Sequence, residues 1–124
     1  MKLNTFMSIA AVVSFIFGVG FIVAPSASLT LYGESTDIVG QFLGRYLGAS
    51  LVGLAFVVWL TRNAAASPIR RGLLVGLFVT NVLGFVVAIY DMFSRTGNAL
   101  SWLNIVIYLL LALGFGYFAF MKTD

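Results

Sequence analysis

The sequence contains no cysteine and no histidine among its 124 residues. Without cysteine, the chain can form neither a disulfide nor a thiolate metal site. Without histidine, it lacks the commonest metal ligand and general base, which excludes nucleophile–histidine relays and the usual axial ligation of haem. Glycine-rich phosphate loops and paired carboxylates are also missing. We therefore expect no catalytic residue, no metal site and no cofactor, and we do not expect an enzyme.

Charged residues are scarce as well. Seven Lys and Arg and four Asp and Glu make up 9% of the chain, whereas hydrophobic residues make up 61%. A soluble domain carries roughly 25% charged residues, because a small fold has a large surface to keep wet. The apolar surplus must therefore face lipid, so the bilayer is the first expected partner. A net charge of +3 is too small to indicate nucleic-acid binding.

Four apolar runs are each long enough to cross a bilayer, for which a helix needs about 20 residues. They cover residues 3–24, 41–60, 73–90 and 100–121 approximately, and the connectors between them are short. The first run exceeds the 7–15 apolar residues of a signal-peptide core, so we expect it to be retained. The sequence predicts one all-α domain over residues 1–124, an integral membrane four-helix bundle in up-down-up-down order.

Basic residues gather on one side of the predicted membrane. The basic positions of the amino end, the second connector and the carboxyl end are Lys2, Arg62, Arg70, Arg71 and Lys122. The two connectors on the other side contain one basic residue, Arg95. By the positive-inside rule, both termini are predicted to be cytoplasmic.

Small residues recur at four-residue spacing in the predicted spans. The positions expected to pack against neighbouring helices are Gly40, Gly44 and Gly48 of the second span and Gly84 of the third. In the third span, Gly72, Gly76 and Thr80 share the spacing of Gly84. Helix association in lipid depends on close contact at such residues, because lipid tails are as apolar as leucine. We favour packing inside the four-helix bundle. A homo-oligomer interface is the alternative.

Polar residues form a second pattern, in the outer half of the predicted membrane. They are Gln41, Arg45, Asn81, Asp91, Asn104 and Tyr108. An ionisable side chain within the membrane is costly and needs a partner. Up-down order brings Arg45, Asp91 and Asn104 to one level. The sequence thus predicts a buried group, here called the outer cluster, centred on an Arg45–Asp91 pair.

The outer cluster has three interpretations. It can be structural, with hydrogen bonds that fix helix register and contribute roughly 0.6 kcal/mol each. Arg45 can instead extend to the outer headgroups and pair with nothing. In the functional interpretation, the cluster binds an anionic or hydroxylated lipid head, or docks a partner helix. The sequence leaves all three open.

Two short motifs carry a family resemblance. Leu31 to Gly33 reads L-Y-G and Gly44 to Ala49 reads G-R-Y-L-G-A, and a proline follows the first span. The chain thereby resembles a family of small bacterial tetraspan proteins of unknown function, distantly similar to DoxX-like proteins. It is more loosely similar to the ergosterol-biosynthesis tetraspan scaffold, which tethers enzymes at the membrane. The resemblance implies a non-catalytic accessory role in a bacterial inner membrane, with Arg45 and Gly48 as matching positions.

The expected function is therefore that of an accessory or scaffold subunit, whose partners are other membrane protein subunits or further copies of this chain. One alternative is a homo-oligomeric transporter or channel for a small molecule or ion. Another is a lipid- or quinone-binding protein with the outer cluster as its polar end. A transporter needs a polar path across the whole membrane. Only Ser14, Thr80 and Asn81 are polar near the middle, which argues against transport.

Overall fold

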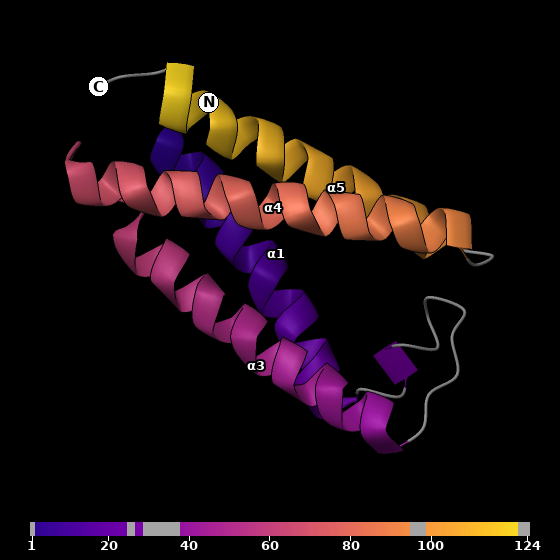
Figure 1. Ribbon diagram of the computed structural model, residues 1–124. Helices are drawn as coiled ribbons and strands as arrows, with labels where there is room; N and C mark the ends of the chain where they lie inside the picture. Colours follow the sequence, from indigo (N-terminus) through magenta and orange to yellow (C-terminus); the bar gives the residue numbers. More distant parts are fainter. Residues whose placement is uncertain (1, 25–26, 29–37, 95–98, 122–124) are drawn as a thin grey trace. The chain divides into compact units, whose positions relative to one another are not determined.

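The computed structural model describes residues 2–24, 27–28, 38–94 and 99–121, and its elements over these residues are helices (Figure 1). The α-helices are α1 (Leu3–Val23), α3 (Ile38–Thr61), α4 (Pro68–Ser94) and α5 (Ala99–Gly116). A π-helical segment, η1 (Tyr117–Met121), follows α5 directly. No strand occurs in this part of the chain, so the predicted all-α class is confirmed for it.

Four of these helical stretches are long and apolar enough to cross a membrane. They are Leu3–Val23, Gly40–Thr61, Pro68–Phe93 and Trp102–Met121. Large apolar side chains are exposed along all four, as at Ile16, Leu43, Leu83 and Leu113. A soluble monomer rarely exposes apolar surface on this scale. The chain is therefore an integral membrane protein by composition and helix length.

Helix α4, which contains the third predicted span, is longer than hydropathy predicts, since it begins at Pro68 rather than near residue 73. The Ser67 hydroxyl accepts a hydrogen bond from the Arg70 backbone N–H at 3.1 Å, as a helix N-cap does. Pro68 fits the first helical position, where no N–H partner is needed. Arg70 and Arg71 were expected in the connector but lie in the first turn of α4, because hydropathy marks the apolar part of a helix and not its capped end.

The chain divides into two compact units, Met1–Asn63 and Ala64–Asp124. We call them the first and second hairpin. In the first hairpin, α1 and α3 lie side by side and run antiparallel (Figure 1). At one end, the Asn4 side-chain amide donates to Asn63 Oδ1 at 3.3 Å. Further along, the Ser14 hydroxyl donates to the Leu51 carbonyl oxygen at 2.7 Å.

Two glycines bring α1 and α3 into backbone contact. A Cβ on Gly18 would lie 2.8 Å from the Gly48 carbonyl oxygen, and one on Gly48 would lie 2.6 Å from that of Gly18. Real Cβ atoms do not approach other atoms so closely, so only glycine fits at either position. Ala10 and Ala55, also small, are buried. The first hairpin is thus packed through small residues, as membrane helices commonly are.

In the second hairpin, α4 packs against α5 and η1 through aromatic rings set over glycines. The Tyr108 ring covers Gly84, where an added Cβ would overlap the ring. A Cβ on Gly116 would lie 2.9 Å from the ring of Phe78. The Phe78 ring also meets Phe120 edge to face, with centroids 5.4 Å apart. Glycine on one helix and an aromatic on the other give this hairpin a packing mode unlike that of the first.

The apolar segment 27–33 of the first connector predicts a helical turn or a shallow cap at the outer membrane interface. Ala27 and Ser28 are helical. The Ser28 N–H donates to the Ala24 carbonyl oxygen and its hydroxyl to that of Gly20, both at 2.9 Å. Residues 29–33, which include the L-Y-G motif, lie outside the described residues.

Candidate functional site

The outer-cluster residues are spread over both hairpins. Gln41 and Arg45 lie one turn apart near the start of α3, in the first hairpin, where Gln41 is half-buried and Arg45 is exposed. Asn81 and Asp91 lie on α4, in the second hairpin. Asn104 and Tyr108, both half-buried, lie one turn apart on α5.

Within the second hairpin, two members of the cluster have defined surroundings. Asn81 is buried at 6% exposure, and its side-chain amide donates to the Leu77 carbonyl oxygen of its own helix at 2.8 Å. Tyr108 packs its ring on Gly84. Asp91 is half-buried near the end of α4 and has an interaction partner. The Arg45–Asp91 pair joins residues of different hairpins and stays a prediction.

The polar residues nearest the middle of the spans are each bonded to a backbone carbonyl. Ser14 donates to Leu51 across the first hairpin. Thr80 donates to Gly76 at 2.9 Å and Asn81 to Leu77, both within α4. Side chains satisfied in this way stabilise helices in lipid and expose few donors to a passing solute. Each of these three side chains therefore has a hydrogen-bond partner within its own hairpin.

The glycines expected to pack behave differently from one another. Gly44 and Gly48 are buried in the first hairpin, and Gly40, one turn earlier, is half-buried. Gly84 meets Tyr108 in the second hairpin. By contrast, a Cβ on Gly72 or Gly76 would meet no atom within 4 Å. The four-residue spacing alone therefore does not decide which glycines face another helix.

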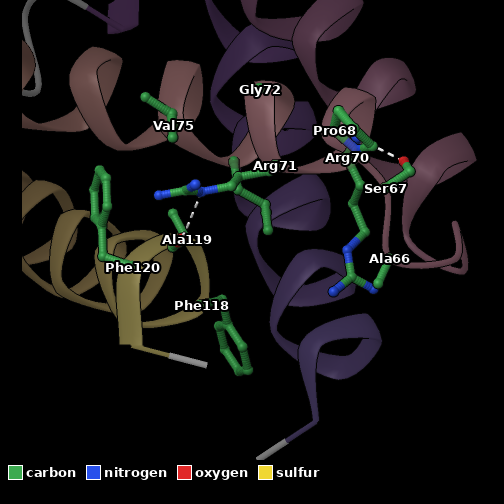
Figure 2. A pocket seen from close by; sticks show the side chains of 11 residues that line it. Ala66, Ser67, Pro68, Arg70, Arg71, Gly72, Val75, Phe118, Ala119 and Phe120 are labelled. Carbon is green, nitrogen blue, oxygen red and sulfur yellow. Dashed lines mark hydrogen bonds between the residues drawn. The ribbon is translucent and has the colours of Figure 1, made fainter. Parts of the chain in front are cut away.

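A pocket lies where the start of α4 meets η1, and all its lining residues belong to the second hairpin (Figure 2). Its volume is about 740 Å³. We call it the basic pocket, because Arg70 and Arg71 line it and no described lining residue is acidic. Its apolar lining includes Leu74, Val75 and Phe118. Charge and apolar surface thus meet in one cavity.

Arg71 is held in place within the basic pocket. Its Nε donates to the Ala119 carbonyl oxygen at 3.3 Å, which links the first turn of α4 to η1. The last carbonyls of a helix lack partners of their own, so they are available to such a donor. The guanidinium carbon also lies 5.8 Å from the centre of the Phe120 ring, within cation–π range. Figure 2 shows the guanidinium extended alongside Phe120 and Val75.

Arg70 points the other way, toward the loop before α4 (Figure 2). Its Nη1 donates to the Ala64 carbonyl oxygen at 3.2 Å. Its backbone N–H binds the Ser67 hydroxyl, and the Arg71 N–H binds the Ser67 carbonyl at 3.0 Å. Arg70 and Ser67 therefore line the basic pocket on the side of the loop before α4, while Arg71 links α4 to η1.

The basic pocket was not predicted from the sequence. One signal was present, because a serine before a proline marks a helix start and would have placed Arg70 and Arg71 in a first turn. Nothing in the sequence marks Tyr117–Met121 as π-helical, and π-helical turns are rare although frequent at functional sites. In the described part of the chain, no group of His, Cys, Asp or Glu could hold a metal ion.

Comparison with known proteins gives one finding. A family model described as "Domain of unknown function (DUF8292)" matches residues 8–124. No curated protein and no solved structure matches the chain. The resemblance to DoxX-like proteins therefore stays a prediction.

Proposed function

The chain belongs to the DUF8292 family, whose function is unknown. We propose that it is a non-catalytic accessory or scaffold subunit of a larger membrane protein assembly. The observation that carries the proposal is an open small-residue face on α4. A Cβ on Gly72 or Gly76 would meet nothing within 4 Å. Thr80, one turn further, is exposed and turns its hydroxyl back to Gly76. In lipid, such faces are where helices approach one another.

The polar chemistry of the chain supports the same proposal. Ser14, Thr80 and Asn81 are bonded to backbone carbonyls, so a homo-oligomeric transporter or channel is less well supported. Binding of a lipid or quinone at the outer cluster depends on Arg45 and Asp91 meeting, which also remains a proposal. An accessory subunit needs neither a polar path nor a paired cluster.

We place the four helices as an up-down-up-down bundle in a bacterial inner membrane, with both termini cytoplasmic. The hairpins support this orientation. Lys2 and Arg62 lie at the end of the first hairpin where Asn4 meets Asn63. Arg70 and Arg71 lie at the end of the second hairpin where α4 meets η1. Because the chain lacks cysteine, an Asn63→Cys variant carries a single thiol that can be labelled. We expect a membrane-impermeant thiol reagent to label it from the cytoplasmic side only.

The subunit proposal is tested by purification from the native membrane in mild detergent, with mass spectrometry of every protein that remains bound. We expect stoichiometric co-purification of other membrane proteins. Gly76→Leu should remove them, since it fills the open face. Val79→Leu is the control, because Val79 is already large and 47% exposed on the same helix.

Two results would contradict the proposal. If the chain purifies with lipid alone, it is not a subunit of a larger assembly. Loss of the folded chain itself with Gly76→Leu, but not with Val79→Leu, would assign the open face to packing within the protein.

A further inference from the structure

We propose that the basic pocket binds the phosphate of an anionic glycerophospholipid from the surrounding membrane, with Arg71 as the main phosphate contact. The site lies at the opposite end of α4 from Asp91. Twenty residues of helix separate Arg71 from Asp91, which corresponds to roughly 30 Å. The proposal is therefore independent of the outer cluster and of the subunit function.

Arg71 has the charge and the hydrogen-bonding capacity to bind a phosphate. A guanidinium offers five N–H donors in a planar fork that matches phosphate. Among the described residues, the Arg71 side chain makes one hydrogen bond, which uses Nε–H. Its four Nη–H donors are therefore available to a ligand. Arg70 adds a second positive charge to the lining of the pocket, and no described lining residue is acidic.

The basic pocket lies at the ends of two predicted membrane spans. One span begins at Pro68 and another ends at Met121, and the pocket is built from these two ends. Both ends of a membrane span lie near the headgroups, so the pocket is expected at headgroup depth. Basic pockets between helices at this depth are typical sites for anionic headgroups.

The apolar wall of the basic pocket favours a lipid over a soluble phosphate compound. Val75 is half-buried and Phe120 is 50% exposed, so both lining side chains have apolar surface to offer a ligand. A glycerol backbone and the start of an acyl chain can follow these side chains while the phosphate meets Arg71. The volume of about 740 Å³ falls in the range of roughly 300–1,000 Å³ that is usual for ligand pockets.

Arg71 is already held by contacts within the protein. The Ala119 carbonyl holds its Nε, and the Phe120 ring lies 5.8 Å from its guanidinium carbon. A side chain fixed before binding loses less conformational freedom when the ligand arrives.

The test is native mass spectrometry of the full-length protein, delipidated in detergent and titrated with phosphatidylglycerol or with zwitterionic phosphatidylcholine. We expect phosphatidylglycerol to bind at least about ten-fold more tightly. Arg71→Gln should weaken its binding about ten-fold, because charge-assisted hydrogen bonds are lost. Arg62→Gln makes the same charge change in the first hairpin, where Arg62 stacks on Trp59 at 3.8 Å, and should leave binding unchanged.

A second variant keeps the charge and fills the cavity. Val75→Trp retains both arginines and should also weaken phosphatidylglycerol binding, while helical circular dichroism and elution as one species remain as in the parent. Should Arg71→Gln fail to fold, Val75→Trp decides alone. Unchanged affinity in the folded Val75→Trp variant would overturn the site.

Two further outcomes would overturn the proposal. Equal losses with Arg71→Gln and Arg62→Gln would mean that only net charge matters. Displacement of phosphatidylglycerol by millimolar inorganic phosphate would assign the pocket to a soluble phosphate compound instead of a lipid.

Discussion

Gly18 and Gly48 touch through their backbones: a Cβ on Gly48 would lie 2.6 Å from the Gly18 carbonyl oxygen. The Ile22 backbone nitrogen would be 2.9 Å from the same Cβ. Both neighbours are backbone atoms, which cannot rotate aside as a side chain can. Any larger residue at position 48 must therefore push α1 and α3 apart.

We expect Gly48→Ala to lower the free energy of unfolding by about 1–3 kcal/mol, the usual cost of overpacking. Gly53→Ala on the same helix is the control, because its Cβ would meet nothing within 4 Å. The control should be neutral or slightly stabilising, since alanine favours helix over glycine. Unfolding by sodium dodecyl sulfate, followed by circular dichroism, measures both. Equal effects of the two substitutions would show that the backbone contact does not form.

Gly84 and Tyr108 form the corresponding contact in the second hairpin. Gly84→Ala places a methyl group where the Tyr108 ring lies, so we expect destabilisation of about 1–3 kcal/mol. In a Tyr108→Ala background, which lacks the ring, Gly84→Ala should cost less stability. A double-mutant cycle measures this coupling. Gly76→Ala on the same helix serves as the control for steric effects, because its Cβ has open space. Additive effects of Gly84→Ala and Tyr108→Ala would rule out the contact.

Ser67 caps α4, and its replacement should weaken the first turn of the helix, which carries the Arg70 and Arg71 of the basic pocket. Ser67→Ala removes the acceptor for the Arg70 N–H and should cost about 1 kcal/mol of stability. Ser67→Asp keeps a capping oxygen and should retain stability. Hydrogen exchange at the amides of residues 69–71 checks the effect locally. Protection unchanged in Ser67→Ala would mean that Pro68 alone fixes the helix start.

The outer cluster is tested by disulfide cross-linking, which a chain without cysteine makes unambiguous. The double variant Arg45→Cys with Asp91→Cys should cross-link under mild oxidant if the two positions meet. Leu60→Cys with Asp91→Cys should not, because Leu60 lies at the far end of α3. Mobility on a non-reducing gel after cleavage between the hairpins reports the result. No cross-link between positions 45 and 91 under any oxidant would remove the cluster.

Hydropathy is enough to predict the four apolar helices, because a span needs length and apolar side chains and both are read directly from the sequence. It places the start of α4 several residues late, since the Ser67 cap and Pro68 add little to a hydropathy sum. Spacing points to Gly48 and Gly84, which meet other helices, but equally to Gly72 and Gly76, which meet none within 4 Å. Periodicity describes one helix, whereas contact depends on a second.

The basic pocket depends on longer-range geometry. It needs Arg71 to reach the carbonyl of Ala119, 48 residues further along the chain. It also needs the π-helical turn at Tyr117–Met121, which the local conformational preferences of these residues do not predict. The Arg45–Asp91 pair requires still more, namely the placement of one hairpin against the other, and so it remains a prediction.

The division at Asn63 and Ala64 bears on how the protein is made. The Gly18–Gly48 contact, the Ser14–Leu51 bond and the Asn4–Asn63 bond all lie within the first 63 residues. The ribosome therefore delivers α1 and α3 with these mutual contacts encoded before it has translated α4. Assembly of the nascent chain can therefore begin with the contacts of the first hairpin before α4 is translated.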